Sequence, residues 1–112
     1  MSIGDRILFE DDQIRIWEMC LQPGEYSETH FHGLPYAIVV VSGDHITVDC
    51  VGNLEGLPAD GYGATKVEQG DSYYLCSGST EVAKNTGSKT YRDIQVEFKQ
   101  ALSTREFKVN GT

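Results

Sequence analysis

Short runs of β-forming residues, separated at close intervals by turn residues, constrain the fold of this chain more than any other feature. Runs rich in Val, Ile, Tyr and Thr recur between clusters of Gly, Asp, Asn and Ser, and helical periodicity of apolar residues is nearly absent. The runs predict strands at about 6–9, 13–21, 27–32, 36–42, 45–50, 64–68, 72–75, 80–86 and 90–99. So many short strands at this spacing predict an all-β sandwich or barrel.

Length and charge narrow the class of protein. The 112 residues suffice for one packed domain. Seventeen acidic residues against nine basic ones leave a net charge of −8, which would repel a phosphate backbone. The longest apolar stretch, Tyr36 to Val41, is far too short to span a membrane, and the N-terminal residues lack the pattern of a secretory signal. We therefore expect a cytoplasmic protein with no nucleic-acid and no membrane partner.

The cysteines and one loop complete this outline. Cys20, Cys50 and Cys76 are odd in number, widely spaced and without a C-x-x-C pair, which fits a reduced compartment, and we expect all three thiols in the core. Residues 51–63 hold four glycines and a proline, so they predict a long loop. That loop is either a surface excursion or a flap over a pocket mouth.

Two histidines give the clearest sign of chemistry. His30 and His32 are two residues apart in the strand predicted at 27–32, so both rings leave the same face, with α-carbons about 6.7 Å apart. That separation lets two imidazoles reach one ion, and neutral imidazole is a good ligand for Zn, Fe, Ni or Cu. By itself, an H-x-H pair is more often exposed or packed in a core than bound to a metal.

The surrounding residues extend the pattern. The first motif of the cupin superfamily is a glycine, five residues, H-x-H, three or four residues, a glutamate, six residues and a glycine. Its intervals are matched, with Tyr36 in place of the glutamate, by Gly24, His30, His32, Tyr36 and Gly43. The intervals of the second motif are matched, with Cys76 for a proline and Glu81 for a histidine, by Gly70, Cys76, Ser77, Gly78, Glu81 and Asn85. Over about residues 6–99 the chain resembles small single-domain cupins.

This resemblance implies a single cupin-type jelly-roll β-barrel over residues 1–112, with a barrel core at about 6–99 and a C-terminal tail at 100–112. It also implies a divalent metal ion, Fe, Mn, Zn or Ni, inside the barrel. Only His30 and His32 carry over directly as ligands, and Glu81 would complete a set of two histidines and one carboxylate. Such a set suits Fe(II) with oxygen and substrate, or Lewis-acid chemistry by the other ions.

Alternatives stay open for the residues around the pair. Glu28 shares the strand face of the histidines and is a second candidate carboxylate, or a residue that orients a ring, although three ligands along one strand would be nearly collinear. Glu81 is otherwise a polar residue at the barrel mouth, in water or paired with Lys84. Tyr36 is a poor ligand because its phenol has an ordinary pKa of about 10. It is expected to bond to substrate or water, to relay a proton, or to pack in the core.

Alternating residues in two strands bear on the pocket. Asp93, Gln95 and Glu97 alternate with apolar residues, and we expect the polar set to face outward because exposed charge is the default. Trp17 and its alternate neighbours Met19 and Leu21 would then form either an apolar wall or a dimer seam.

These residues support a metal-dependent enzyme acting on a small organic molecule, by dioxygenase-type or Lewis-acid isomerase or lyase chemistry. His30, His32 and Glu81 would hold the ion, and Tyr36 and Glu81 would be catalytic. A non-catalytic binding module and a metal-free isomerase are the alternatives. We also expect a homodimer, because two-fold pairs are the commonest oligomers.

Overall fold

A computed structural model describes residues 3–50 and 63–100 of the chain. The strands in these ranges are β1 (Arg6–Glu10), β2 (Ile14–Leu21), β3 (His30–Phe31), β4 (Tyr36–Ser42), β5 (His45–Cys50), β6 (Gly63–Lys66), β7 (Ser72–Leu75), β8 (Thr80–Lys84) and β9 (Tyr91–Phe98). The predicted all-β class is confirmed, and all strands except β3 begin and end within two residues of their predicted bounds. Within the described ranges, no helix has the length and apolarity that crossing a membrane needs.

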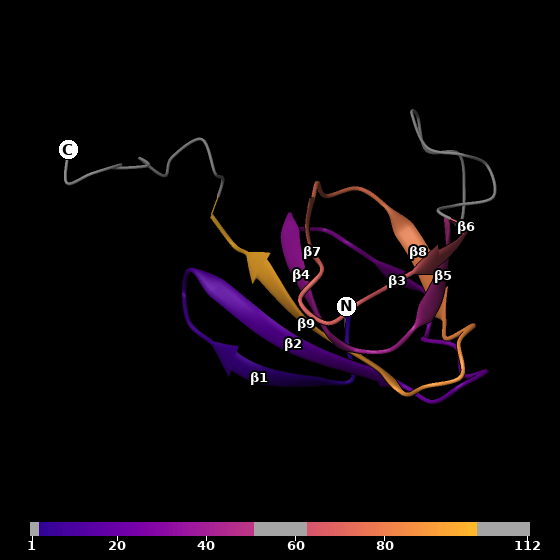
Figure 1. The fold of residues 1–112 in the computed structure, drawn as a ribbon. Helices are drawn as coiled ribbons and strands as arrows, with labels where there is room; N and C mark the ends of the chain where they lie inside the picture. The colour runs from indigo at the N-terminus through magenta and orange to yellow at the C-terminus, as the bar shows by residue number, and fades with distance from the viewer. Residues whose placement is uncertain (1–2, 51–62, 101–112) are drawn as a thin grey trace.

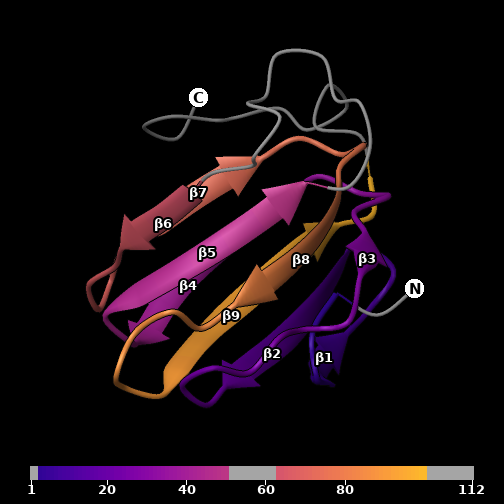
Figure 2. The ribbon, with the colours of Figure 1, turned by 90° about the vertical axis from the view of Figure 1, so that its right-hand side faces the viewer.

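The strands form two antiparallel sheets that face each other (Figures 1 and 2). The five-stranded sheet has the order β1-β2-β9-β4-β7, and the four-stranded sheet has the order β3-β8-β5-β6. Neighbours in a sheet are mostly distant in sequence, as with β2 and β9 or β3 and β8, because the chain crosses repeatedly between the sheets. This is a jelly-roll arrangement.

The core lies between the sheets and consists of inward-facing side chains of both. The cluster of buried apolar residues is Met19, Leu21, Val40, Ile46, Val67, Ala83 and Tyr91. Trp17 is buried as well. The face shared by Trp17, Met19 and Leu21 is therefore an apolar wall of the interior, and it is not available as a dimer seam.

The polar residues of β9 face the interior, so the prediction that they point outward was wrong. Asp93, Gln95 and Glu97 are all buried. Asp93 accepts hydrogen bonds from the Tyr91 hydroxyl and the Gln95 amide. Glu97 accepts from the Arg15 guanidinium and the indole N–H of Trp17. Because each buried carboxylate has such partners, the usual cost of burying it is largely offset.

Two further expectations need correction. Cys76 is exposed and Cys20 is half-buried, so neither is the core thiol that we expected. Cys76 is exposed because it lies between β7 and β8, outside the packed part of either strand. The predictions for residues 51–62 and 101–112, and for the side chain of Cys50, lie outside the described residues.

Candidate metal centre

Strand pairing between β3 and β8 positions the two histidines beside the glutamate. His30 lies directly opposite Glu81 in the register of the two strands. Beyond β3 the ladder continues, since the amide of His32 donates to the Ser79 carbonyl and the amide of Gly78 donates to the His32 carbonyl, each at 2.8 Å. The extended backbone therefore turns both rings to the same inner face, where His30 is 4% exposed and His32 is 1% exposed.

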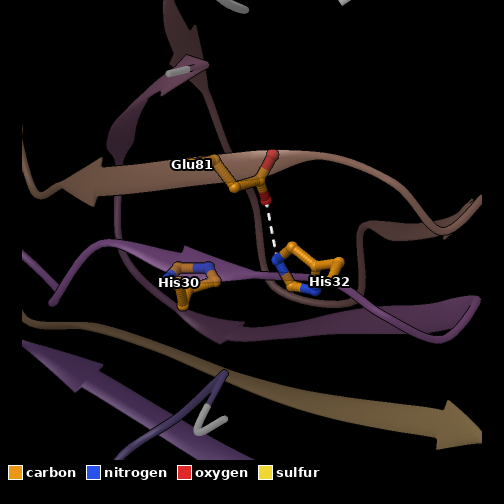
Figure 3. Close-up of side chains that lie close together, drawn as sticks. All are labelled: His30, His32 and Glu81. Carbon is orange, nitrogen blue, oxygen red and sulfur yellow. Dashed lines mark ion pairs between the residues drawn. The ribbon is translucent and has the colours of Figure 1, made fainter. Parts of the chain in front are cut away.

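The three predicted ligands converge in the interior (Figure 3). Nε2 of His32 lies 2.9 Å from Oε1 of Glu81. One ligand atom from each of His30, His32 and Glu81 can be chosen such that all lie within 4.8 Å of one another. Glu81 is itself only 6% exposed. An ion with bonds of about 2.0–2.2 Å to nitrogen and oxygen needs ligand atoms gathered on this scale.

Hydrogen bonding and burial set the protonation of the group. Nδ1 of His30 donates to the carbonyl of Glu28 at 2.8 Å, which leaves Nε2 as the nitrogen with a free lone pair. Burial lowers the pKa of His30, and the bond to the Glu28 carbonyl opposes only part of that effect. Burial raises the pKa of Glu81, but contacts with His32 and Tyr36 outweigh it and hold that pKa below its ordinary value. A neutral imidazole and an ionised carboxylate are the forms that bind metal ions.

Buried atoms without partners test whether an ion fits. Both ring nitrogens of His32 and Oε2 of Glu81 are buried and have no hydrogen-bond partner. The 2.9 Å contact between Nε2 of His32 and Oε1 of Glu81 lacks the alignment of a hydrogen bond. Leaving such groups unsatisfied costs free energy, and a cation that accepts their lone pairs would satisfy them. The residues present therefore fit a divalent ion.

Tyr36 supports this group from the opposite sheet. Its hydroxyl donates to Oε1 of Glu81 at 3.1 Å, and its ring stacks on that of His32 with centroids 3.9 Å apart and planes 9° apart. Tyr36 is buried, at the place where the cupin motif has a glutamate ligand. It therefore contacts two of the candidate ligands directly. Sequence reasoning missed the stack on His32, because no local pattern shows two rings meeting across sheets.

The alternative partners lie elsewhere. The Glu28 side chain is exposed, and this residue orients the His30 ring through its backbone carbonyl instead of its carboxylate. The ammonium of Lys84 lies over the ring of Tyr26, 4.8 Å from its centroid, and makes no ion pair with Glu81. Glu81 is thus the carboxylate that the structure brings to the histidines.

Comparison with known proteins shows which fold this architecture belongs to. No protein-family model and no curated protein sequence matches the chain. Among solved structures, a cupin domain from Bordetella pertussis Tohama I matches with a TM-score of 0.71 at 16% identity, over 89% of this chain and 99% of that one. This chain has the cupin fold. An RmlC-like cupin family protein with a double-stranded β-helix fold, from Methanocaldococcus jannaschii, matches this chain with a TM-score of 0.61 at 13% identity, over 88% of this chain and 93% of that one.

The similar structures include enzymes. The polyketide cyclase RemF from Streptomyces resistomycificus matches this chain with a TM-score of 0.57 at 19% identity, over 80% of this chain and 57% of that one. At such identities the likeness shows the fold and leaves the activity to be argued from the site.

The four glycines at the motif positions have a physical reason to be glycine. Gly24, Gly43, Gly70 and Gly78 all have positive φ angles, between 84° and 128°. Residues with a β-carbon avoid this region. The intervals between the glycines in both motifs therefore mark where the chain turns between strands.

Proposed function

We propose that this cupin domain is a metal-dependent enzyme that acts on a small organic molecule, with His30, His32 and Glu81 as the ligands. The supporting observation is that buried ligand atoms from two distant segments converge, and that several of them have no hydrogen-bond partner. Imidazole and carboxylate together suit Fe, Mn, Zn or Ni. An enzyme among the similar structures supports a catalytic use of the fold.

The ion would add reactivity that the side chains lack. When bound, a divalent ion supplies Lewis-acid activation of a substrate oxygen or, if it is redox-active, electron exchange with dioxygen. Three protein ligands leave other coordination positions for substrate and water. The reaction is accordingly of the dioxygenase type or a Lewis-acid isomerisation or lyase reaction.

The surrounding side chains prepare the site for this chemistry. The Glu28 carbonyl fixes the ring orientation and tautomer of His30. The Tyr36 hydroxyl holds a proton 3.1 Å from Oε1 of Glu81, so an acid and a carboxylate lie side by side next to the candidate ligands. A substrate bound at the ion would meet both groups, and these are the roles proposed for Tyr36 and Glu81.

Elemental analysis of the full chain, purified without an affinity tag from metal-supplemented medium, tests the proposal. We expect about one divalent ion per chain, with loss of the ion in His32→Ala and in Glu81→Gln, which removes the charge but preserves the shape. His45→Ala is the matched control, because His45 is exposed on β5 and outside the group. Absence of an ion in the wild type, or retention of it in His32→Ala, would overturn the proposal.

A metal-free binding cupin is the competing function. One contact favours it, since Oε1 of Glu81 already accepts a hydrogen bond from Tyr36 without any ion. In that case the protein would remain free of metal even with divalent ions in excess, while still binding a small molecule.

A further inference from the structure

A cavity between the two sheets ends at the candidate metal centre. Its volume is about 170 Å³, and its wall includes apolar side chains of β4, β5 and β7 together with Glu81 of β8. The apolar side chains that matter here are Ile38, Val40, Ile46, Val48 and Leu75. Because Glu81 belongs both to the wall and to the ligand group, a molecule in this cavity would abut the metal centre.

The residues that line the cavity disfavour a charged ligand. No Lys or Arg is among the described residues that line the cavity, so an anionic group inside it would find no counter-charge among them. Of the polar wall groups, the Tyr91 hydroxyl already donates its proton to Asp93. Glu81 adds an acidic side chain and no basic one to this wall. The cavity therefore suits a neutral, mostly apolar body.

A second hollow, which touches His30, is different in character. A cleft of about 260 Å³ touches His30 and is lined by Asp5, Glu28 and Ser27 among others. The centre thus has a polar approach on the His30 side and an apolar cavity on the Glu81 side. An amphipathic molecule would be oriented by this difference, with its apolar part in the cavity.

Volume limits the size of the apolar part. An engineered protein cavity of about 150 Å³ lined by aliphatic and aromatic side chains binds benzene. The cavity here, at about 170 Å³, is of the same scale. It accommodates one six-membered ring, or a branched chain of similar bulk.

We propose that the substrate is a neutral molecule with a single-ring or branched-alkyl body, held in this cavity, and a hydroxyl or carbonyl oxygen directed at His30, His32 and Glu81. This substrate class rests on the proposed function, since only a metal centre at Glu81 makes an occupant of the cavity a substrate.

Calorimetric titration of the full chain with two probes, in the presence and absence of Zn²⁺, tests the substrate class. Phenol has one ring and one oxygen, and malonate has as many non-hydrogen atoms without an apolar body. We expect phenol to bind at least about tenfold more tightly than malonate. Equal or tighter binding of malonate would overturn the proposal.

Two variants on strand β4 test whether phenol binds in this cavity. Val40 lines the cavity and is 2% exposed, whereas its neighbour Val39 points away from the core and is 40% exposed. We expect Val40→Phe to fill the cavity and weaken phenol binding at least about tenfold, and Val39→Phe to change it less than about twofold. Equal phenol binding by both variants would overturn the proposal. If Val40→Phe does not unfold cooperatively, Val48→Phe makes the same test from β5.

Measuring bound metal shows whether a negative result concerns the substrate class or the proposed metal-dependent function. If Zn²⁺ binds and phenol does not, the substrate class is wrong while the metal centre stands. If phenol binds and is lost in Val40→Phe while no ion binds to the wild type, the metal-dependent function is wrong, and with it the assignment of the occupant as a substrate.

Discussion

At the scale of single residues, the centre depends on how Tyr36 holds its two neighbours. The hydroxyl bonds to Glu81 and the ring stacks on His32, so one side chain orients two candidate ligands. Groups that orient metal ligands affect metal affinity nearly as strongly as some ligands do. Replacing the motif glutamate by tyrosine thus exchanges a possible ligand for a positioning residue.

Removing only the hydroxyl separates the two contacts of Tyr36. In Tyr36→Phe the stack on His32 is retained and the hydrogen bond to Glu81 is lost, so the pKa of Glu81 rises and protons compete better with the ion. We expect Zn²⁺ affinity to fall about tenfold, measured by competition with a chelator. Tyr74→Phe, at an exposed position on β7, serves as the control. An affinity equal to that of the wild type would show that the hydroxyl does not position Glu81.

Asp93 makes stability depend on pH. Burial raises its pKa from an ordinary 3.8 to about 6, against the opposing hydrogen bonds from Tyr91 and Gln95. Because the folded state holds this proton more tightly than the unfolded state does, the contribution of Asp93 to stability is full below pH 3.8 and is lost as pH rises through about 6.

Asp93→Asn is expected to remove that dependence. Relative to wild type, the variant should gain up to about 3 kcal/mol in free energy of unfolding between about pH 4 and pH 7. Urea denaturation of both proteins across this range measures the difference, in which the pH dependence of the other carboxyl groups cancels. A difference that does not change with pH would mean that Asp93 titrates normally.

At the scale of elements, β3 shows how a side chain shortens a strand. The sequence pattern predicted a strand over 27–32, yet β3 comprises only His30–Phe31. The amide of Ala83 donates to Oγ of Ser27, so a hydroxyl takes the place of a main-chain carbonyl in the ladder. The pairing with β8 is therefore interrupted between the isolated bridge of Tyr26 with Lys84 and the regular ladder that begins at His30.

The turn between β4 and β5 gives a prediction about Gly43. This glycine has a φ of +128°, and a β-carbon there would lie 3.0 Å from Cδ2 of Tyr91 and 3.3 Å from its Cα. Gly43→Ala should therefore lower the free energy of unfolding by more than the roughly 1–3 kcal/mol that backbone strain alone costs. Gly78→Ala is the matched control, since Gly78 has a φ of +113° but a β-carbon added to it would meet no atom within 4 Å. Equal losses in both variants, measured by thermal unfolding, would exclude the contact with Tyr91.

At the scale of the whole molecule, the centre joins the two sheets. The candidate ligands belong to the β3 and β8 region of the four-stranded sheet, while Tyr36 belongs to β4 of the five-stranded one. Tyr36 reaches Glu81 and His32 only when the sheets are packed face to face. Occupation of the centre should consequently stabilise the fold as a unit.

Thermal unfolding with and without Zn²⁺ tests this coupling. At a free ion concentration of about 100 times the dissociation constant, we expect about 2.7 kcal/mol of added stability for the wild type and for His45→Ala. His32→Ala should gain far less, because it lacks a ligand. A gain of the same size in all three proteins would assign the effect to ions bound elsewhere.

The homodimer, the single domain over 1–112 and the cytoplasmic location stay predictions.

The sequence by itself determined the strands, the turns and the pairing of the histidines on one face, because strand alternation and glycine turns depend on neighbouring residues. It also placed Glu81 by its interval from Gly78 and Asn85. Only the tertiary structure decided that the polar face of β9 points inward, that Tyr36 lies on His32, and that an apolar cavity ends at Glu81. These features depend on which side chains of one sheet meet those of the other. A period of two in a strand sets two faces but leaves open which one is buried.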